Sequence, residues 1–586
     1  MPCLITIVAV SLSLFQLYAA GIRPLGLFYQ RPIHLGFILV LCFLVFPVTG
    51  RGRPRGVPGW LVDIPLILGG ILVGLWLPLN IDTIANAVFP RRIDVAVGVV
   101  TTLVVLEAAR RAVGLAMTII GAIFILYAFA GVRGELPWLA DWLPGILNHR
   151  GYSIERVASQ LTLGAEGIFG IPLGVAATFI FVFVLFGAFL EVSGAGRFFI
   201  DLAYAATGRQ RGGPAKAAVL ASAGMGSVSG SAIANVVTTG AFTIPLMKRL
   251  GYRPAQAGGI EAAASTGGQI MPPLMGAGAF LMSEFTQVPY VDIVLVSIFP
   301  AILYFGSVYL LVHIAAVKLG LEGIPARDLM RARDVLKDGW HFLLPLIALT
   351  YFLIAGYSPM RVGFFAIVSI VLAASARAIW VFLRDAPTVG GFRELLGNGA
   401  ALTLHALERG ARNAVAVSLA CAVAGIIVGM VGLTGLGLKF SAMMLALSGG
   451  NLVLALVMVI LASLVLGMGL PVTAAYIVLI ILVGPALTSE FGVPLLVAHL
   501  VVFWYSQDSN VTPPVALAGF AASAIAGSKP METSFQAWKY AKGLYLIPLF
   551  MVFNPSIILG GPLLLVLWTG TIAVIALTAF AAMLEG

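Results

Sequence analysis

Two short polar stretches interrupt long apolar runs in the middle of this chain, and they restrict its fold more than any other feature. Ser229-Gly230-Ser231 and Ser265-Thr266-Gly267-Gly268-Gln269 lie between apolar segments, and Pro272-Pro273 follows the second stretch. Glycine, serine and paired prolines should break a helix here. At membrane depth a broken helix is tolerated only where protein or a watery cavity covers it, because each unpaired backbone group costs several kcal/mol in hydrocarbon. Such breaks expose helix ends and carbonyls, so we predict a binding site.

The same pattern occurs a second time in the chain. A shift of 241 residues, with no gap, superimposes these positions: Gly226 on Gly467, Gly251 on Gly492, Ser265 on Ser506, Gln269 on Asn510, and Pro272-Pro273 on Pro513-Pro514. Paired prolines flanked by glycine and serine at one fixed offset favour a duplication over chance matching. The repeats span about residues 171 to 290 and 412 to 531. Two related halves, each with interrupted helices, are typical of secondary transporters.

Composition places the chain in the membrane. Hydrophobic residues make up 60% of it and charged residues 10%, with a mean hydropathy of +1.05. The apolar runs suggest about sixteen membrane-embedded segments. The net charge of +10 arises from clusters such as Arg91-Arg92 and Lys248-Arg249, which lie between apolar runs. This pattern is typical of cytoplasmic loops and argues against nucleic-acid binding.

The N-terminal 150 residues are predicted to form a separate helical module. Its first apolar run, residues 4 to 20, lacks the positively charged start of a signal peptide, so we expect a retained transmembrane helix. Glu107 precedes Arg110 and Arg111 by three and four residues, and an interfacial salt bridge is favoured over a buried coupling group because arginines snorkel to the surface. The polar, aromatic residues 136 to 153 mark the boundary with a second module, residues 151 to 586.

Motifs for enzymatic chemistry are weak. No G-x-x-x-x-G-K-[ST] loop for ATP occurs, and the six histidines show no metal-binding spacing. Ser229 lies between small residues, so an intramembrane serine hydrolase with His499 as base is one alternative. However, Gly226 recurs at Gly467, where Leu470-Pro471-Val472-Thr473 replaces the serines. A duplicated binding cradle fits this better than a unique nucleophile, so we expect a protein that is not an enzyme.

Several long motifs resemble one transporter family. They are EGIFGIPLGVAATFIFVFVLFGAFLEVSGAG, GSVSGSAIANVVTTGAFTIPLMKRLGY, EAAASTGGQIMPPLMGAGAFLM and NVTPPVALAGFAASAIAG. In this order they resemble the large membrane subunit of tripartite ATP-independent periplasmic (TRAP) transporters, over about residues 95 to 586. The N-terminal module resembles the small membrane subunit fused to it, as in the TAXI subclass, although residues 1 to 90 match only in hydropathy.

This resemblance implies an all-α, multi-pass, elevator-type carrier of the bacterial inner membrane. Its two repeats are expected to be inverted, each with a re-entrant hairpin and an interrupted helix. The residues 1 to 150 would be scaffold. The chain would import a small organic acid by symport, usually with sodium, and receive it from a periplasmic TAXI-type solute-binding protein. A carrier that works without a binding protein is the alternative within transport.

The resemblance also marks candidate substrate- or ion-binding residues, without assigning individual sodium ligands. They are Ser229, Gly230, Ser231, Asn235, Ser265, Thr266, Gly267, Gly268 and Gln269 in the first half, and Gly469, Pro471, Thr473, Ser506, Asp508, Ser509, Asn510 and Thr512 in the second. The helix breaks are marked by Pro272, Pro273, Pro513 and Pro514. No cofactor is expected beyond the coupling ion.

Asp508 departs from the pattern, because it stands where the first repeat has Gly267. An acid beside a membrane-embedded helix break is costly unless it pairs with a cation or takes up a proton. Asp508 would therefore help to bind sodium or carry a proton. The alternatives are a helix N-cap or a solvent-facing acid at the mouth of a cavity. Sodium is the expected coupling ion, and the proton is the alternative.

Overall fold

The computed structural model describes residues 2–50, 56–325, 327, 329–384, 389–467 and 469–585. In these residues the regular secondary structure is helical, with a single isolated β-bridge between Ala130 and Leu136. The predicted all-α class is confirmed. Nine of the described helices are long and apolar enough to cross a membrane, and four shorter apolar helices accompany them. The predicted sixteen membrane-embedded segments also included hairpins and short helices such as α12 (Pro254–Gly267), so this number of long helices does not test that prediction.

The chain forms two compact units, which are described separately. The first unit contains Met1–Leu185 and Leu404–Gly492, and the second contains Phe186–Thr403 and Val493–Gly586. Two helices, α8 (Phe181–Ser193) and α18 (Val389–Thr434), contribute residues to both units. Each unit therefore combines a segment from the first half of the chain with one from the second half.

The first unit contains the N-terminal helices and part of the second repeat. Its helices are α1 (Pro2–Gly21), α2 (Leu27–Val45), α3 (Val57–Ala85), α4 (Arg92–Ala112), α5 (Leu115–Phe129), α6 (Ile154–Thr162), α7 (Ile171–Val175), α19 (Leu436–Ser448), α20 (Leu452–Leu466) and α21 (Val472–Pro485). Glycines bring α2 and α3 together: a Cβ on Gly36 would lie 2.6 Å from Gly74 Cα and 3.1 Å from Gly70 O. Small residues at such contacts let membrane helices approach closely.

Polar side chains join the N-terminal helices to α18. Ser13 Oγ donates to Leu407 O at 2.8 Å, and His34 Nε2 lies 2.9 Å from Ser418 Oγ. The other ring nitrogen of His34 lies 2.6 Å from Gln16 Nε2. Buried polar groups need such partners, so these contacts specify how α1 and α2 pack on α18.

The charged group at the end of α4 differs from the expectation. Arg110 is exposed and pairs with Glu107 at 2.8 Å, as an interfacial salt bridge would. Arg111 also contacts Glu107, at 2.6 Å, but its side chain is only 3% exposed and its Nη1 lies 2.6 Å from Asp63 Oδ1 on α3. The interfacial interpretation is therefore wrong for Arg111, because α3 supplies a buried carboxylate that local sequence spacing does not reveal.

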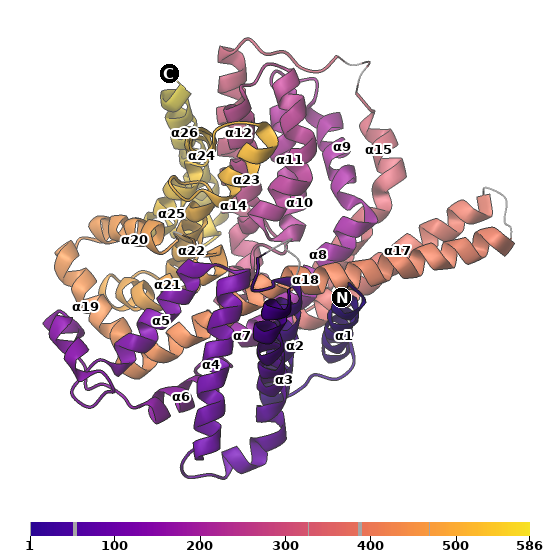
Figure 1. Cartoon of the computed structure of the whole chain (residues 1–586). Coiled ribbons are helices and arrows are strands. Elements are labelled where there is room, and N and C mark those ends of the chain that lie inside the picture. Colours follow the sequence, from indigo (N-terminus) through magenta and orange to yellow (C-terminus); the bar gives the residue numbers. More distant parts are fainter. Residues whose placement is uncertain are drawn as a thin grey trace. The chain divides into compact units, whose positions relative to one another are not determined.

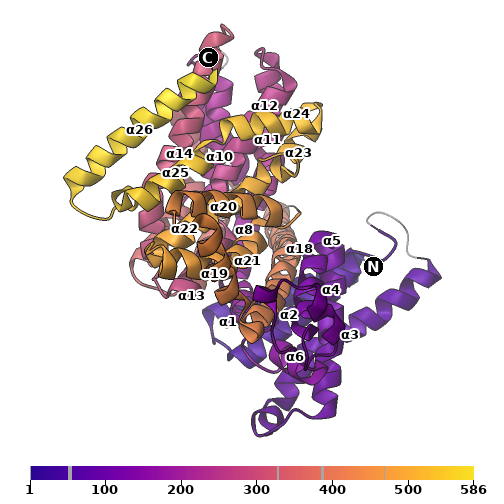
Figure 2. The same cartoon turned by 90° about the vertical axis from the view of Figure 1, so that its left-hand side faces the viewer.

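The second unit contains the hairpin and the interrupted helix of the first repeat. Its helices are α9 (Ala195–Thr207), α10 (Gly213–Ser229), α11 (Ala232–Arg249), α12, η4 (Gly268–Ile270), α13 (Ala277–Thr286), α14 (Tyr290–Lys318), α15 (Ala332–Gly339), α16 (Leu343–Ile354), α17 (Pro359–Arg384), α22 (Leu495–Tyr505), η8 (Ser506–Asn510), α23 (Leu517–Ala526), α24 (Pro530–Tyr540), α25 (Gly543–Phe553) and α26 (Leu563–Glu585). Helix α12 packs against α10, α11, α23 and α24, and both views show these five helices side by side (Figures 1 and 2).

The sequence offset of 241 recurs in the helix bounds. Ala195–Thr207 and Leu436–Ser448 are separated by this offset at both ends, and each follows a glycine in the left-handed conformation. Helix α12 begins at Pro254 and α22 at Leu495, again 241 residues apart. Duplicated local sequence has thus produced duplicated helix boundaries.

Candidate functional site

The first helix break lies where the sequence predicts it. Helix α10 ends at Ser229, Gly230 has a left-handed φ of 60°, and Ser231 is the N-cap of α11. The Ser231 side chain accepts a hydrogen bond from Ala234 N at 3.3 Å. Glycine adopts positive φ at little cost, and serine is a favoured N-cap, so these residues terminate one helix and start the next.

The second break begins later than predicted. Helix α12 continues through Gly267, and η4 follows directly to Ile270, so Ser265 and Thr266 are helical. The helical backbone is interrupted only from Met271, directly before Pro272-Pro273. The peptide bond between these two prolines is cis, as is the bond between Pro513 and Pro514 in the second repeat. Gly267 and Gly268 do not break the helix because both have right-handed helical backbone angles.

The two breaks of the first repeat contact each other. Gln269 Nε2 donates to Gly230 O at 3.1 Å, and Leu274 N donates to Ser227 O at 3.3 Å. Backbone also meets backbone nearby: a Cβ on Gly226 would lie 2.4 Å from Gly268 Cα. Only glycines permit this approach, which brings the hairpin tip against the end of the interrupted helix.

The second repeat contributes η8 to the same group. Asn510 Nδ2 donates to Gln269 Oε1 at 2.9 Å. The Ser506 hydroxyl donates to Phe503 O of α22 at 2.7 Å, and the Ser509 hydroxyl donates to Ser506 O of η8 at 3.2 Å. Thr512 shares a hydrogen bond with the Tyr545 hydroxyl. The predicted site residues of the first half and those from Ser506 to Thr512 therefore belong to the same compact unit, and the Gln269–Asn510 hydrogen bond joins the two sets.

Three predicted residues belong to the other compact unit. Gly469 has a left-handed φ of 84°, Pro471 occupies the N-cap position of α21, and Thr473 lies in its first turn. They form a helix start in the first unit, as the break predicted from the sequence requires.

Two buried oxygens at the first break lack hydrogen-bond partners among the described residues. They are Ser229 Oγ and Asn235 Oδ1. The amide nitrogen of Asn235 is used, because it donates to Ser222 O at 2.9 Å and so ties α11 to α10. Buried polar atoms are normally satisfied, so unpartnered acceptors at a helix break are candidate ligands for a cation or a donor. In the part of the chain that the structure describes, no base forms a hydrogen bond with Ser229 Oγ.

Asp508 is fully buried, within η8. The solvent-facing interpretation is therefore wrong. Helix α23, which follows the break, begins at Leu517 and has Ala516 at its N-cap position, so Asp508 does not cap that helix. Its backbone carbonyl accepts from Val511 N and Thr512 N, which closes the turn after η8.

One residue of this region was missed by the sequence analysis. Glu261, in the middle of α12, is fully buried and contacts four hydroxyl groups. The signal was present, because Glu261 opens the EAAASTGG motif and is the single acid of α12. Its partners on α10 and α11 lie far away in sequence, so spacing alone did not reveal them.

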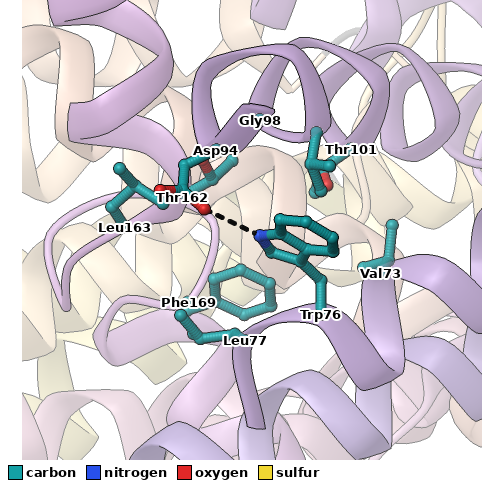
Figure 3. Close-up of a pocket in the computed structure, with 10 residues that line it drawn as sticks. Val73, Trp76, Leu77, Asp94, Gly98, Thr101, Thr162, Leu163 and Phe169 are labelled. Carbon is teal, nitrogen blue, oxygen red and sulfur yellow. Dashed lines mark hydrogen bonds between the residues drawn. The ribbon is translucent and has the colours of Figure 1, made fainter. Parts of the chain in front are cut away.

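A small cavity in the first unit is a poor candidate site. Trp76, Asp94 and Phe169 line it, with Trp76 Nε1 donating to Asp94 Oδ1 at 3.2 Å (Figure 3). Its volume is about 10 Å³. This is close to the minimum that holds one water molecule, so it cannot accommodate an organic solute.

The paired helix breaks and the many apolar helices define a multi-pass membrane transporter. The family model described as "Tripartite ATP-independent periplasmic transporter, DctM component" matches residues 100–560. The chain therefore belongs to this family, whose members are transporters and not enzymes. It is a multi-pass protein of the inner membrane.

Named relatives agree with this assignment. The chain is 23% identical over 411 residues to the 2,3-diketo-L-gulonate TRAP transporter large permease protein of Escherichia coli, covering 70% of this chain and 90% of the relative. It is 32% identical over 171 residues to the C4-dicarboxylate TRAP transporter large permease protein of Pseudomonas aeruginosa, covering 28% and 39%. A putative TRAP transporter large permease protein of Haemophilus influenzae is 24% identical over 303 residues, covering 48% and 69%.

Proposed function

We propose that this chain imports a small organic acid by ion-driven symport and receives it from a separate periplasmic solute-binding protein. Family membership supports the tripartite arrangement. The observation that carries the proposal is the hydrogen bond between Gln269 and Asn510, which joins the helix breaks of both repeats. Such paired breaks form solute sites in secondary transporters.

The proposed substrate class rests on relatives and on a helix end. Two relatives are named for organic acids, a C4-dicarboxylate and 2,3-diketo-L-gulonate. Helix α11 begins beside Gly230 with Ser231 at its N-cap position. The first N–H groups of a helix have no intrahelical partner and favour a carboxylate. The first break therefore has the chemistry to bind an organic anion.

Sodium is the proposed coupling ion. Hard cations prefer oxygen ligands, and the unpartnered Ser229 Oγ and Asn235 Oδ1 provide two of them at a break where carbonyls are also available. Bound sodium would supply positive charge beside the substrate anion. The proton, with Asp508 as its carrier, is the alternative.

The fused small subunit, the TAXI subclass and the elevator mechanism are part of the same proposal. Hydrogen bonds from Ser13 and His34 to α18 support residues 1 to 150 as a scaffold held against the large-subunit part. In an elevator mechanism the substrate site moves with one part of the protein against such a scaffold.

The test is uptake of labelled succinate by proteoliposomes that contain this chain, with its cognate binding protein outside. An imposed inward sodium gradient should drive accumulation above the equilibrium level. The same liposomes with sodium equal on both sides should only equilibrate. Succinate accumulation that does not depend on the sodium gradient would refute sodium coupling. If neither succinate nor any other tested organic acid is taken up, the proposed substrate class is refuted.

A further inference from the structure

We propose that Glu261 is a proton-binding site of this carrier, separate from the helix breaks. The role of Glu261 in transport rests on the proposed function, whereas its binding of a proton does not. The acid lies in the middle of α12, is fully buried, and is surrounded by hydroxyl groups from three helices of the second unit. An ionisable residue in the interior of a membrane protein is costly, and such residues are functional candidates by default.

Four hydroxyls contact the two carboxyl oxygens. Oε1 lies 2.8 Å from Ser222 Oγ on α10, 2.5 Å from Thr239 Oγ1 on α11 and 3.0 Å from Ser265 Oγ on α12. Oε2 lies 2.5 Å from Thr243 Oγ1 on α11. An ionised carboxylate can accept about four hydrogen bonds, so this set satisfies the charged form.

The same atoms also satisfy the protonated form. Thr243 Oγ1 has a second acceptor, Thr239 O at 3.1 Å, and Thr239 Oγ1 has Asn235 O at 2.8 Å. When Glu261 carries a proton on Oε2, it donates to Thr243 Oγ1, and the Thr243 hydroxyl turns to Thr239 O. Hydroxyl rotation alone thus accommodates both states, because a hydroxyl both donates and accepts. The two protonation states therefore need no difference in the positions of the helices.

Neighbouring charges do not fix Glu261 in its ionised state. No lysine, arginine or histidine among the described residues forms a hydrogen bond or ion pair with it. Tyr204 of α9 lies close enough to interact electrostatically with it.

The other titratable groups on the elements packed against α12 have partners of their own or are exposed. Lys216 of α10 donates to Gln210, and Lys248 of α11 donates to Ala526 O, while Arg249 is exposed. On α24, Tyr540 accepts from Gln256, Lys539 pairs with Glu585, and Glu532 is exposed. On α14, Tyr290 donates to Leu274 O, Tyr304 to Ala263 O, Tyr309 to Gln210 and Lys318 to Glu585 O, while Asp292 is exposed and His313 is half-buried. Asp508 lies on η8. Helix α23 and η4 carry none.

The fold itself does not require this acid. At the offset of 241, Glu261 corresponds to Val502, Thr239 to Ile480 and Thr243 to Gly484. The second repeat therefore starts its matching helix, α22, at the equivalent residue although an apolar side chain stands at the position of Glu261. A buried carboxyl at this position is therefore not a packing requirement of the duplicated unit. Gly240 makes room for it, since a Cβ there would lie 3.1 Å from Glu261 Cγ.

A proton fits this site better than a metal ion. The four hydroxyls already touch the carboxyl oxygens at hydrogen-bond distances, whereas a metal needs a hollow surrounded by oxygens. Proton binding forms one O–H bond on Oε2 and neutralises the carboxylate. Release returns that proton to water and restores the charge, so the step needs no co-reactant.

The direct test is infrared spectroscopy of the purified full chain between high and low pH. We expect a protonated-carboxyl band that shifts when all glutamates carry carbon-13 and that is lost in Glu261→Gln. The control Glu532→Gln, an exposed acid on α24, should keep the band. A band that survives Glu261→Gln, or that shifts with labelled aspartate instead of labelled glutamate, would overturn the inference. If Glu261→Gln does not fold, Thr243→Val, which removes the hydroxyl beside Oε2, should shift the band, and an unshifted band in that variant would overturn the inference.

A second experiment separates this site from the transport proposal. In proteoliposomes with the cognate binding protein and labelled succinate, an inward proton gradient should increase the sodium-driven uptake of wild type and leave Glu261→Gln unaffected. Equal stimulation of both proteins would overturn the role of Glu261, although sodium-driven symport would stand. Absent succinate uptake would count against the proposed substrate class, and the infrared result would still decide whether Glu261 binds a proton.

Discussion

Gln269 and Asn510 occupy equivalent positions in the two sequence repeats, and they are hydrogen-bonded to each other, with Asn510 Nδ2 2.9 Å from Gln269 Oε1. Gln269 also donates to Gly230 O at the tip of the hairpin. One side chain therefore connects three structural features: the hairpin tip and the two interrupted helices. This relationship explains why a duplicated sequence can produce a single composite site.

The first prediction concerns this pair. Gln269→Ala and Asn510→Ala should each reduce transport, and the double variant should lose less stability than the sum of the single variants, by about 1 kcal/mol, because both remove the same hydrogen bond. Chemical denaturation of the solubilised protein measures this coupling. Gln256→Ala is the control, since it removes a hydrogen bond to Tyr540 of similar length away from the breaks. Strict additivity would show that the pair does not interact.

The second prediction is dependence on a partner. Liposomes that contain this chain alone should take up little labelled succinate, and adding the cognate binding protein should start uptake, because the family is tripartite. A binding protein from an unrelated transporter serves as control. Rapid uptake without any partner would instead support a carrier that works alone.

The third prediction assigns a role to Asp508, which is buried in η8, just before the helix break of the second repeat at Pro513-Pro514. A carboxylate there would help to bind sodium, so Asp508→Asn should lose sodium-driven accumulation and keep substrate exchange. Uptake is measured under an imposed sodium gradient and, separately, an imposed pH gradient. Loss of pH-driven uptake alone would make Asp508 a proton carrier. A variant that matches wild type under both gradients would show that Asp508 has no coupling role.

The fourth prediction concerns the buried ion pair between Arg111 and Asp63. Arg111→Met removes the arginine partner of a fully buried carboxylate, and such a loss typically costs about 3 to 5 kcal/mol. The melting temperature of the solubilised protein should fall clearly. Arg110→Met, which breaks only the exposed salt bridge, should cost about 1 kcal/mol or less. Equal effects of the two variants would mean that burial of the pair is unimportant.

The fifth prediction is a pH dependence at His149, in the connection between α5 and α6. Burial lowers the pKa of His149 below its ordinary value of 6.5, and nearby Lys439 lowers it further, while the bond to Tyr127 O opposes the shift. Because the unfolded chain then binds more protons, this residue's contribution to stability is complete above pH 6.5 and is lost as the pH falls through the lowered pKa.

His149→Gln should therefore reduce the loss of melting temperature on acidification below pH 6.5. His405→Gln, at an exposed position of α18, is the matched control and should retain the wild-type pH profile. Identical pH profiles for wild type and His149→Gln would contradict the assignment.

Much of the fold could be predicted because it depends on local sequence. Apolar runs give helices, Gly230 and Ser231 end one helix and begin the next, and the offset of 241 predicts matching helix bounds. The second break was placed too early, since Ser265 and Thr266 remain helical until the prolines remove the backbone donors. Local chemistry thus indicates that a break exists more reliably than where it begins.

The sequence by itself determined the all-α membrane class, the duplication and the two pairs of helix breaks, because each follows from hydropathy and backbone preferences of neighbouring residues. Only the tertiary structure decided which side chains meet. Asp63 reaches Arg111 from another helix, Asn510 reaches Gln269 across the repeats, and hydroxyls from three helices surround Glu261. The energies of these polar groups depend on burial and on partners distant in the chain, which no local pattern encodes.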